Sequence, residues 1–281
     1  MNARVAIRTS GNGREKAKMS DGYLITPQMF VNKINALIYG DPGSGKTHLA
    51  GTAQDVPEMA DVHVFNIDGG IMTLANRGDI HATDIHSVDD LEQELFKIVN
   101  HEEKYATTKT VVIDNITELQ TLALESLTTQ EFANRRKKDK NYSIDQVYLE
   151  DYGVAGKRLA RILRGFRDLP IHVLYIAHKK DKMRQGTNTL EESKPNLTDK
   201  LSTAIMGYQD YVWYLYTADE MVGDEEHGYH SETHRYMLTQ PMNNYAAKTR
   251  GADFAQALGP IVKDPTFPEI MRIYKETYNA V

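Results

Sequence analysis

Short apolar runs alternate along the chain with longer stretches of helical spacing. The apolar runs are typical of strands and lie at residues 34–39, 62–67, 110–113 and 171–177. Apolar residues recur every three or four positions at 88–99, 116–132 and 148–169, which predicts helices. The alternation predicts an α/β fold, a mostly parallel sheet flanked by helices.

The last third of the chain has a different pattern. Residues 178–197 are polar and are predicted to form a long loop, followed by a short helix over 198–206 with Thr198 as its N-cap. Two β-rich runs joined by the polar segment 219–234 are expected to add edge strands near the C-terminus; they lie at 211–216 and 236–239.

Composition excludes several classes of protein. The 281 residues are 41% hydrophobic and 26% charged and include no cysteine, which removes disulfide scaffolds, thiol nucleophiles and cysteine-bound metals. The chain lacks an apolar run of membrane-spanning length and an apolar leader, so we expect a cytoplasmic protein without membrane contact. Residues 1–22 are expected to be a flexible tail before a single domain over 23–281.

The charge is unevenly distributed. The net charge is -6, yet residues 135–184 carry fourteen Lys and Arg against six Asp and Glu. Such a basic segment on an acidic chain fits either local binding of an anion or ordinary solvated helices and loops.

A complete phosphate-binding motif follows the first apolar run. Residues 40–47 read GDPGSGKT and fit G-x-x-x-x-G-K-[ST], between a strand and a helical pattern. Lys46 supplies a charge for the β- and γ-phosphates of ATP, and Thr47 a hydroxyl for Mg²⁺. The residues assigned to the nucleotide are Gly40, Asp41, Pro42, Gly43, Ser44, Gly45, Lys46, Thr47 and His48.

A second motif supplies the expected metal carboxylate. The apolar strand TVVI ends at Asp114, and a parallel strand would bring this residue to the same sheet edge as the phosphate loop. Asp114 and Thr47 are therefore the predicted Mg²⁺ ligands.

These motifs together resemble a known group, the RecA-like P-loop ATPases encoded by many bacteriophages, which include single-strand annealing proteins and phage nucleotide-binding proteins. The resemblance spans residues 34–251. It rests on LIYGDPGSGKTHLA (37–50), VVIDNITEL (111–119), DYG (151–153), LYIAH (174–178) and KTRG (248–251).

The resemblance implies catalytic roles beyond Lys46. Asp68 is the candidate to orient the attacking water, with Glu118 as its rival or as a helix cap. His178 would sense the γ-phosphate, unless it only pairs with a backbone carbonyl. Lys248 and Arg250 would reach the γ-phosphate of a neighbouring subunit, the alternative being a solvated edge strand protected by charge.

The resemblance also implies that single-stranded DNA binds the basic loop after the fourth strand, through Lys179, Lys180, Lys182 and Arg184. Other basic sets lie at 135–138, near Tyr142 and Tyr148, and at Lys157, Arg158, Arg161, Arg164 and Arg167; each could contact DNA or be solvated. His227, His230 and His234 lack an apolar frame for a metal site, and the aromatic run from Tyr208 to Tyr216 favours strand packing over a base platform.

The combined prediction is a Mg²⁺-dependent ATPase that forms rings or filaments, binds single-stranded DNA and acts in phage recombination or annealing. Single-strand-binding or other recombination proteins are candidate partners. One alternative is a DNA remodelling or packaging helper that acts through protein partners. A nucleotide kinase fits less well, because residues 179–197 offer only Arg184 for an arginine lid.

Overall fold

The structure is a computed structural model that describes residues 33–224 and 228–279. The tail predicted at 1–22 lies outside the described residues, and so does His227 of the histidine group.

One mixed sheet organises the fold. Its strands are Asn35–Gly40 (β1), Val62–Asn66 (β2), His81–Asp84 (β3), Thr110–Asp114 (β4), His172–Met183 (β5), Leu190–Pro195 (β6), Tyr211–Asp224 (β7), Gly228–Leu238 (β8), Lys248–Thr249 (β9) and Ile261–Lys263 (β10). The order is β10-β8-β7-β1-β5-β4-β2-β3, with β6 paired to β5 and β9 paired to β7. The strands from β7 to β3 in this order run parallel, whereas β6, β8, β9 and β10 pair antiparallel.

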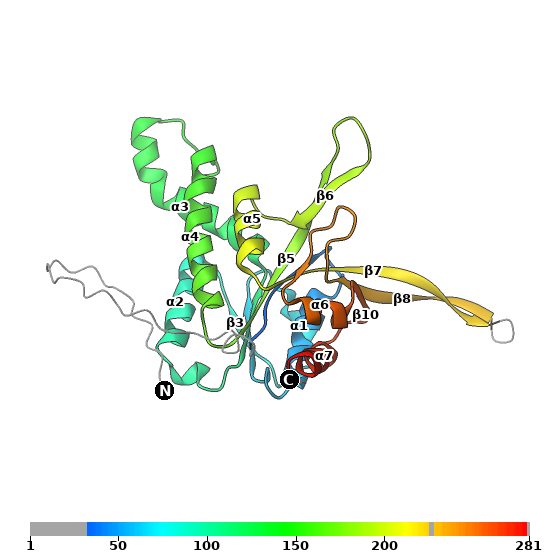
Figure 1. The fold of residues 1–281 in the computed structure, drawn as a ribbon. Coiled ribbons are helices and arrows are strands. Elements are labelled where there is room, and N and C mark those ends of the chain that lie inside the picture. The colour runs from blue at the N-terminus through cyan, green and yellow to red at the C-terminus, as the bar shows by residue number, and fades with distance from the viewer. Residues whose placement is uncertain (1–32, 225–227, 280–281) are drawn as a thin grey trace.

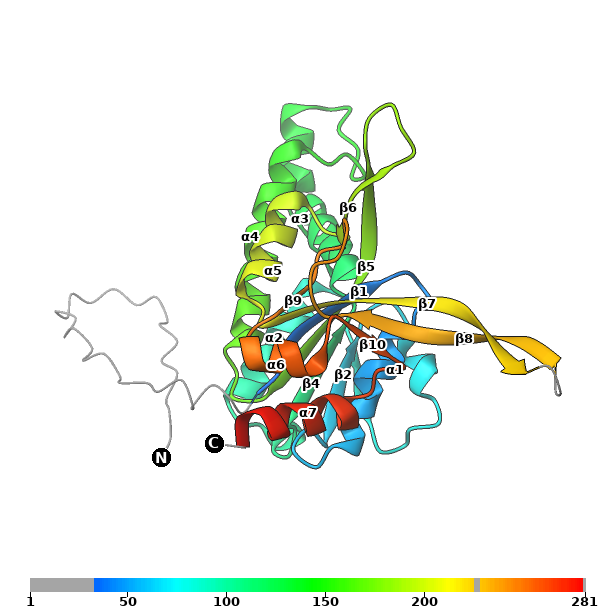
Figure 2. The same ribbon diagram turned by 45° about the vertical axis from the view of Figure 1, so that its right-hand side comes forward.

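Helices cover both faces of the sheet, as Figures 1 and 2 show. They are Lys46–Gly51 (α1), Val88–Val99 (α2), Ile116–Lys138 (α3), Leu149–Arg167 (α4), Asp199–Tyr208 (α5), Ala252–Leu258 (α6) and Phe267–Asn279 (α7). Short 3₁₀ helices lie at Thr52–Asp55, Gly70–Leu74 and Glu103–Tyr105. Helices α2 to α5 pack on one face, and α1, α6 and α7 pack on the other.

The central strands are continuously apolar because both of their faces are buried. In β1, Leu37 and Tyr39 point to the α2–α5 face, while Ala36 and Ile38 point to the α1 face. The predicted fold class, a mostly parallel sheet flanked by helices with added strands near the C-terminus, is confirmed. Among the described residues, no helix is long and apolar enough to cross a membrane.

Two long hairpins project from this body, β5–β6 and β7–β8 (Figures 1 and 2). The long loop predicted at 178–197 is therefore wrong, because β5 continues to Met183 and returns as β6. The polar segment 219–234 likewise belongs mostly to β7 and β8. Beyond the body neither face of these strands is buried, so their side chains are polar and carry little of the apolar alternation that marks a strand.

The helix boundaries lie closer to the predicted ones than the strand boundaries do. Helix α3 extends six residues past the predicted end at 132, to Lys138. Thr198 occupies the N-cap position of α5, but its side chain makes no capping hydrogen bond. Strand β9 ends at Thr249, so Arg250 lies just beyond it.

Candidate nucleotide-binding and hydrolysis site

The phosphate loop joins the end of β1 to the start of α1. Gly43 and Gly45 have φ of 79° and 92°, in the left-handed region that favours glycine. A Cβ on Gly43 would meet no atom within 4 Å, and the buried Ser44 hydroxyl has no hydrogen-bond partner in the described part of the chain. A tightly turned glycine loop with unpaired polar atoms is the cradle that a phosphate group requires.

Lys46 is held inside this loop. Its Nζ donates to the carbonyl oxygens of Asp41 at 2.7 Å and of Gly40 at 3.2 Å. Burial lowers the pKa of Lys46, and the nearby Asp114, Asp41 and Asp68 oppose that effect. The loop therefore keeps a buried ammonium where phosphate oxygens would become its partners.

Thr47 and Asp114 lie together as predicted for a magnesium site. The Thr47 hydroxyl donates to Asp114 Oδ2 at 2.6 Å. Burial raises the pKa of Asp114 to about 6, against the hydrogen bond from Thr47, and the charge of Asp68 raises it further. A hydroxyl and one carboxylate suit Mg²⁺, which takes its other ligands from water and nucleotide phosphates. Accordingly, the described residues hold no cluster of three or more His, Cys, Asp or Glu suited to a metal.

Asn115 links the remaining predicted groups. Its Nδ2 donates to Asp68 Oδ2 and lies 3.2 Å from His178 Nε2, while its Oδ1 accepts from the backbone N–H of Glu118 at 2.8 Å. Asn115 was not among the sequence candidates. Its position immediately before a helix, where asparagine is a preferred N-cap, was the available signal.

The sequence does not establish how close Asp68 lies to the predicted metal ligands. In the structure it lies near Asp114. Its Oδ1 accepts from the Gly70 N–H at 3.0 Å, and a Cβ on Gly70 would lie 3.8 Å from Asp114 Oδ2. Glu118 stands one turn into α3, and its charge acts on His178. The charges of both carboxylates thus act on the same histidine.

His178 ends the buried part of β5. Its N–H donates to the Thr117 hydroxyl at 3.0 Å, and its ring Nε2 lies 3.9 Å from Asp68 Oδ2. Burial and the Lys46 charge lower the pKa of His178, so the imidazole is neutral at neutral pH. The ring Nδ1 has no partner among the described residues, and no ring-to-carbonyl pairing of the kind considered as an alternative is present there.

Lys248 and Arg250 lie at the opposite end of the sheet. Lys248 Nζ donates to the Met206 carbonyl at 2.6 Å, and Arg250 binds Asp210. Asp210 comes immediately before Tyr211, the β7 residue that pairs with Ala36 at the start of β1. The six residues of β1 separate this end from the phosphate loop by about 20 Å. The pair cannot reach a phosphate bound in the loop of its own subunit.

The four DNA candidates lie along β5 and at the tip of its hairpin. Lys179 Nζ lies 3.1 Å from Asp41 Oδ2 and 2.9 Å from Asp181 Oδ2, and Lys182 pairs with Glu191. Lys180 and Arg184 are exposed and make no ion pair within the described residues. Lys180 and Arg184 are thus the freest of the four to meet an outside anion.

Most arginines of the other basic sets hold the fold. Arg135 binds Asp151 and the Tyr142 hydroxyl, joining α3 to α4. On α4, the charges pair with acids of α2 or lie over the Tyr208 ring, as seen for Arg158, Arg161, Arg164 and Arg167. Tyr142 is fully buried, so it cannot stack on a base.

Most of the aromatic run from Tyr208 to Tyr216 packs against neighbouring aromatic side chains, as the sequence predicts. Tyr211 stacks on Trp213, and Tyr214 stacks on Tyr216 and Tyr245. His230 and His234 pair with carboxylates.

Comparison with known proteins identifies the family. An AAA domain model matches residues 32–251, well over half of the chain. A search of curated proteins finds no match. Among solved structures, a crystal structure of the RadB recombinase is similar with a TM-score of 0.41 and 9% identity, over 82% of this chain and 86% of that one. This chain belongs to the AAA domain family and is a P-loop nucleoside triphosphatase.

Proposed function

We propose that this protein is a Mg²⁺-dependent ATPase that binds single-stranded DNA as an ATP-dependent oligomer and acts in DNA recombination or annealing, as in phage. The observation that carries the proposal is the ion pair between Lys179 and Asp41. Lys179 begins the basic hairpin immediately after His178, and Asp41 belongs to the phosphate loop. A change in the loop on nucleotide binding would therefore act directly on the base of the hairpin.

The hydrolysis chemistry is divided among the residues around the loop. Lys46 neutralises phosphate oxygens, and Thr47 with Asp114 would hold the magnesium ion, which supplies positive charge to the reacting phosphate. Asp68 orients the attacking water, while Asn115 fixes the direction of its carboxylate. The neutral His178 donates a hydrogen bond toward the reacting phosphate.

The β5–β6 hairpin is the proposed DNA contact. Lys180 and Arg184 are exposed along it, and Lys182 adds a third charge that is partly offset by Glu191. The hairpin residues 179–195 include no aromatic side chain. Binding should therefore depend on phosphates and on salt, with little contribution from base stacking.

The position of Lys248 and Arg250 supports the proposed oligomer. Since neither reaches the phosphate loop of its own subunit, a role at the γ-phosphate requires a neighbouring subunit in a ring or filament.

A second candidate is a DNA remodelling or packaging helper that acts through protein partners. The α3–α4 tip favours it, because Leu149 is 90% exposed and Val154 is 54% exposed. Exposed apolar side chains gathered on a projection are typical of protein contacts.

The test is the salt dependence of single-strand binding by the Lys180→Glu, Arg184→Glu double variant. Loss of two phosphate contacts should reduce the slope of log affinity against log salt by about 1.4, and reversed charge should also weaken binding. The matched control is Lys104→Glu with Lys200→Glu, two exposed lysines outside the basic sets. An unchanged slope in the hairpin variant would place the contact elsewhere.

A further inference from the structure

Arg235 of β8 lies beside the phosphate loop. It pairs with Thr217 of β7, two positions beyond Leu215, and Leu215 is the partner of Gly40 at the end of β1. Arg235 therefore extends past the end of β1 in the direction of the loop. Met237, two residues further along β8, is buried in the cluster that contains α1, so strand alternation places Arg235 on the α1 face as well.

The side chain reaches Gly45. A Cβ on Gly45 would lie 2.5 Å from Nε and 2.6 Å from Cδ of Arg235, so the end of the arginine side chain lies directly beside the loop backbone. Burial lowers the pKa of His48, and the charge of Arg235 lowers it further. The positive field of Arg235 thus covers the first turn of α1.

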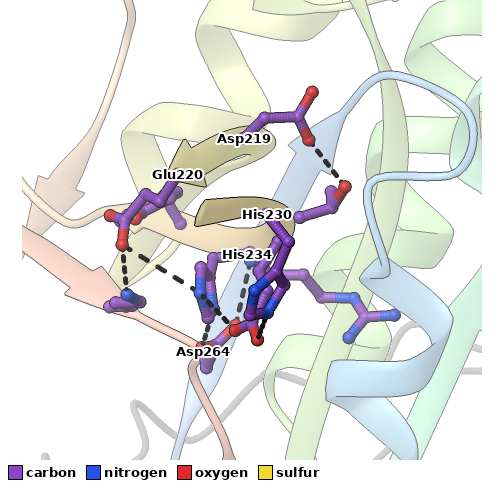
Figure 3. Close-up of polar contacts among 10 residues, drawn as sticks. Asp219, Glu220, His230, His234 and Asp264 are labelled. Atoms are coloured by element: carbon purple, nitrogen blue, oxygen red, sulfur yellow. Dashed lines mark hydrogen bonds and ion pairs between the residues drawn. The ribbon is translucent and has the colours of Figure 1, made fainter. Parts of the chain in front are cut away.

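The backbone of Arg235 is fixed by Asp264. Its N–H donates to Asp264 Oδ1 at 3.0 Å, and its carbonyl accepts from the Asp264 N–H at 2.7 Å. His234 Nδ1 lies 2.7 Å from Asp264 Oδ2, and Figure 3 shows His234 beside Asp264, with Glu220 close by. The guanidinium itself makes no hydrogen bond or ion pair with any described residue. An arginine that is anchored at its backbone and has unused guanidinium donors next to a phosphate loop is suited to bind an anion there.

We propose that Arg235 binds the nucleotide in its own subunit, at the α- and β-phosphates. The groups expected around the γ-phosphate, Asp68 and His178, come from the loop after β2 and from β5, on one side of β1. Arg235 approaches from β7 and β8 on the other side. Its contact is therefore with the part that ATP and ADP share. This role is distinct from that of Lys248 and Arg250, which lie at the far end of the sheet.

The test is isothermal titration of Mg-ATP and Mg-ADP into the full chain carrying Arg235→Ala or Arg235→Lys. Loss of a charge-assisted contact to phosphate should weaken both nucleotides by at least about tenfold in the alanine variant. The lysine variant should lie between alanine and wild type, because it keeps the charge and loses the planar donor fork. The matched control, Arg272→Ala, removes an exposed arginine of α7 and should bind both nucleotides normally.

The pattern across the two nucleotides decides the proposal. Unchanged ADP affinity in Arg235→Ala would overturn it, whether or not ATP binding falls, since the shared phosphates would then not need the arginine. The thermal midpoint without nucleotide should stay at the wild-type value, because the side chain is exposed and has no polar partner among the described residues. If the midpoint falls in the alanine variant, the lysine variant decides instead. A lysine variant with a normal midpoint and normal ADP affinity would overturn the proposal.

Discussion

Asp114 is placed where burial opposes its charge. The side chain is 4% exposed, and its pKa is raised from about 3.8 to about 6. Between those values the folded protein binds more protons than the unfolded chain, so this group lowers stability as pH rises from about 4 to about 6. Such a cost is expected of a carboxylate kept ionised for a cation.

Asp114→Asn should therefore stabilise the nucleotide-free protein. At pH 7.5 we expect a gain of about 2 kcal/mol, because the variant removes a buried charge and keeps an acceptor for Thr47. The gain should vanish near pH 4, and Mg-dependent nucleotide binding should be lost at every pH. Denaturant unfolding at both pH values measures this, with the exposed Asp253→Asn as control. An equal gain at pH 4 and pH 7.5 would contradict the assignment of the effect to charge.

Asp68 and Glu118 should differ in their effect on turnover. Asp68→Asn should lower kcat by about 10²-fold, the usual range for loss of a group that orients or activates water, with little change in KM. Glu118→Gln should lower kcat less than about tenfold, because its carboxylate stands outside the Asn115–Asp68 hydrogen bond. Steady-state ATPase rates of the two variants compare them directly. A larger loss in Glu118→Gln would assign the water to Glu118.

The turn of the phosphate loop and the position of Asp114 beside Thr47 could be predicted from the sequence, because both motifs encode local geometry. Glycines at positive φ and a carboxylate at the end of a buried strand have the same consequence in any α/β sheet. The roles of Asn115 and Arg235 could not be predicted in this way. Their roles depend on contacts with Asp68 and Gly45, which are distant in the sequence, and no local pattern records such contacts.

At the scale of elements, the strands of the body and those of the projecting hairpins differ in how well the sequence predicts them. Strands β1, β4 and the first half of β5 were predictable since both faces are buried and their residues are apolar. The sequence predicts a loop for the β5–β6 hairpin because most of its side chains, other than Ser193 and Pro195 near the body, are exposed or only partly buried. Hydrogen bonds between backbone groups, which leave no mark in the sequence, hold it together.

The α3–α4 projection depends on Arg135. Its guanidinium makes two bonds to the buried Asp151, and Arg135→Ala would leave that carboxylate without its charged partner, with the Tyr148 N–H still donating to it. We expect a loss of about 2–3 kcal/mol in stability, somewhat below the cost of breaking a fully buried pair. Chemical denaturation measures the loss, and Lys137→Ala, an exposed neighbour, should change it by less than about 0.5 kcal/mol. If Arg135→Ala keeps full stability and instead weakens DNA binding, the basic segment is a nucleic-acid contact.

At the scale of the whole molecule, the two ends of the sheet carry separate halves of one proposed active site. The phosphate loop lies at one end of β1, and Lys248 with Arg250 lies at the other. Mixing Lys46→Ala with Arg250→Ala protein should restore part of the ATPase activity that each variant lacks alone. Some interfaces would then join an intact loop to an intact arginine. No recovery, once native mass spectrometry confirms mixed assemblies, would argue that the pair does not act between subunits.

The ATPase rate with and without single-stranded DNA tests the central claim most directly. The ion pair between Lys179 and Asp41 connects the β5–β6 hairpin, the proposed DNA contact, to the phosphate loop, so DNA bound there should change the hydrolysis rate. We predict at least severalfold stimulation by saturating single-stranded DNA in wild type, and no turnover with or without DNA in Lys46→Ala. A wild-type rate that is the same with and without DNA would contradict the account.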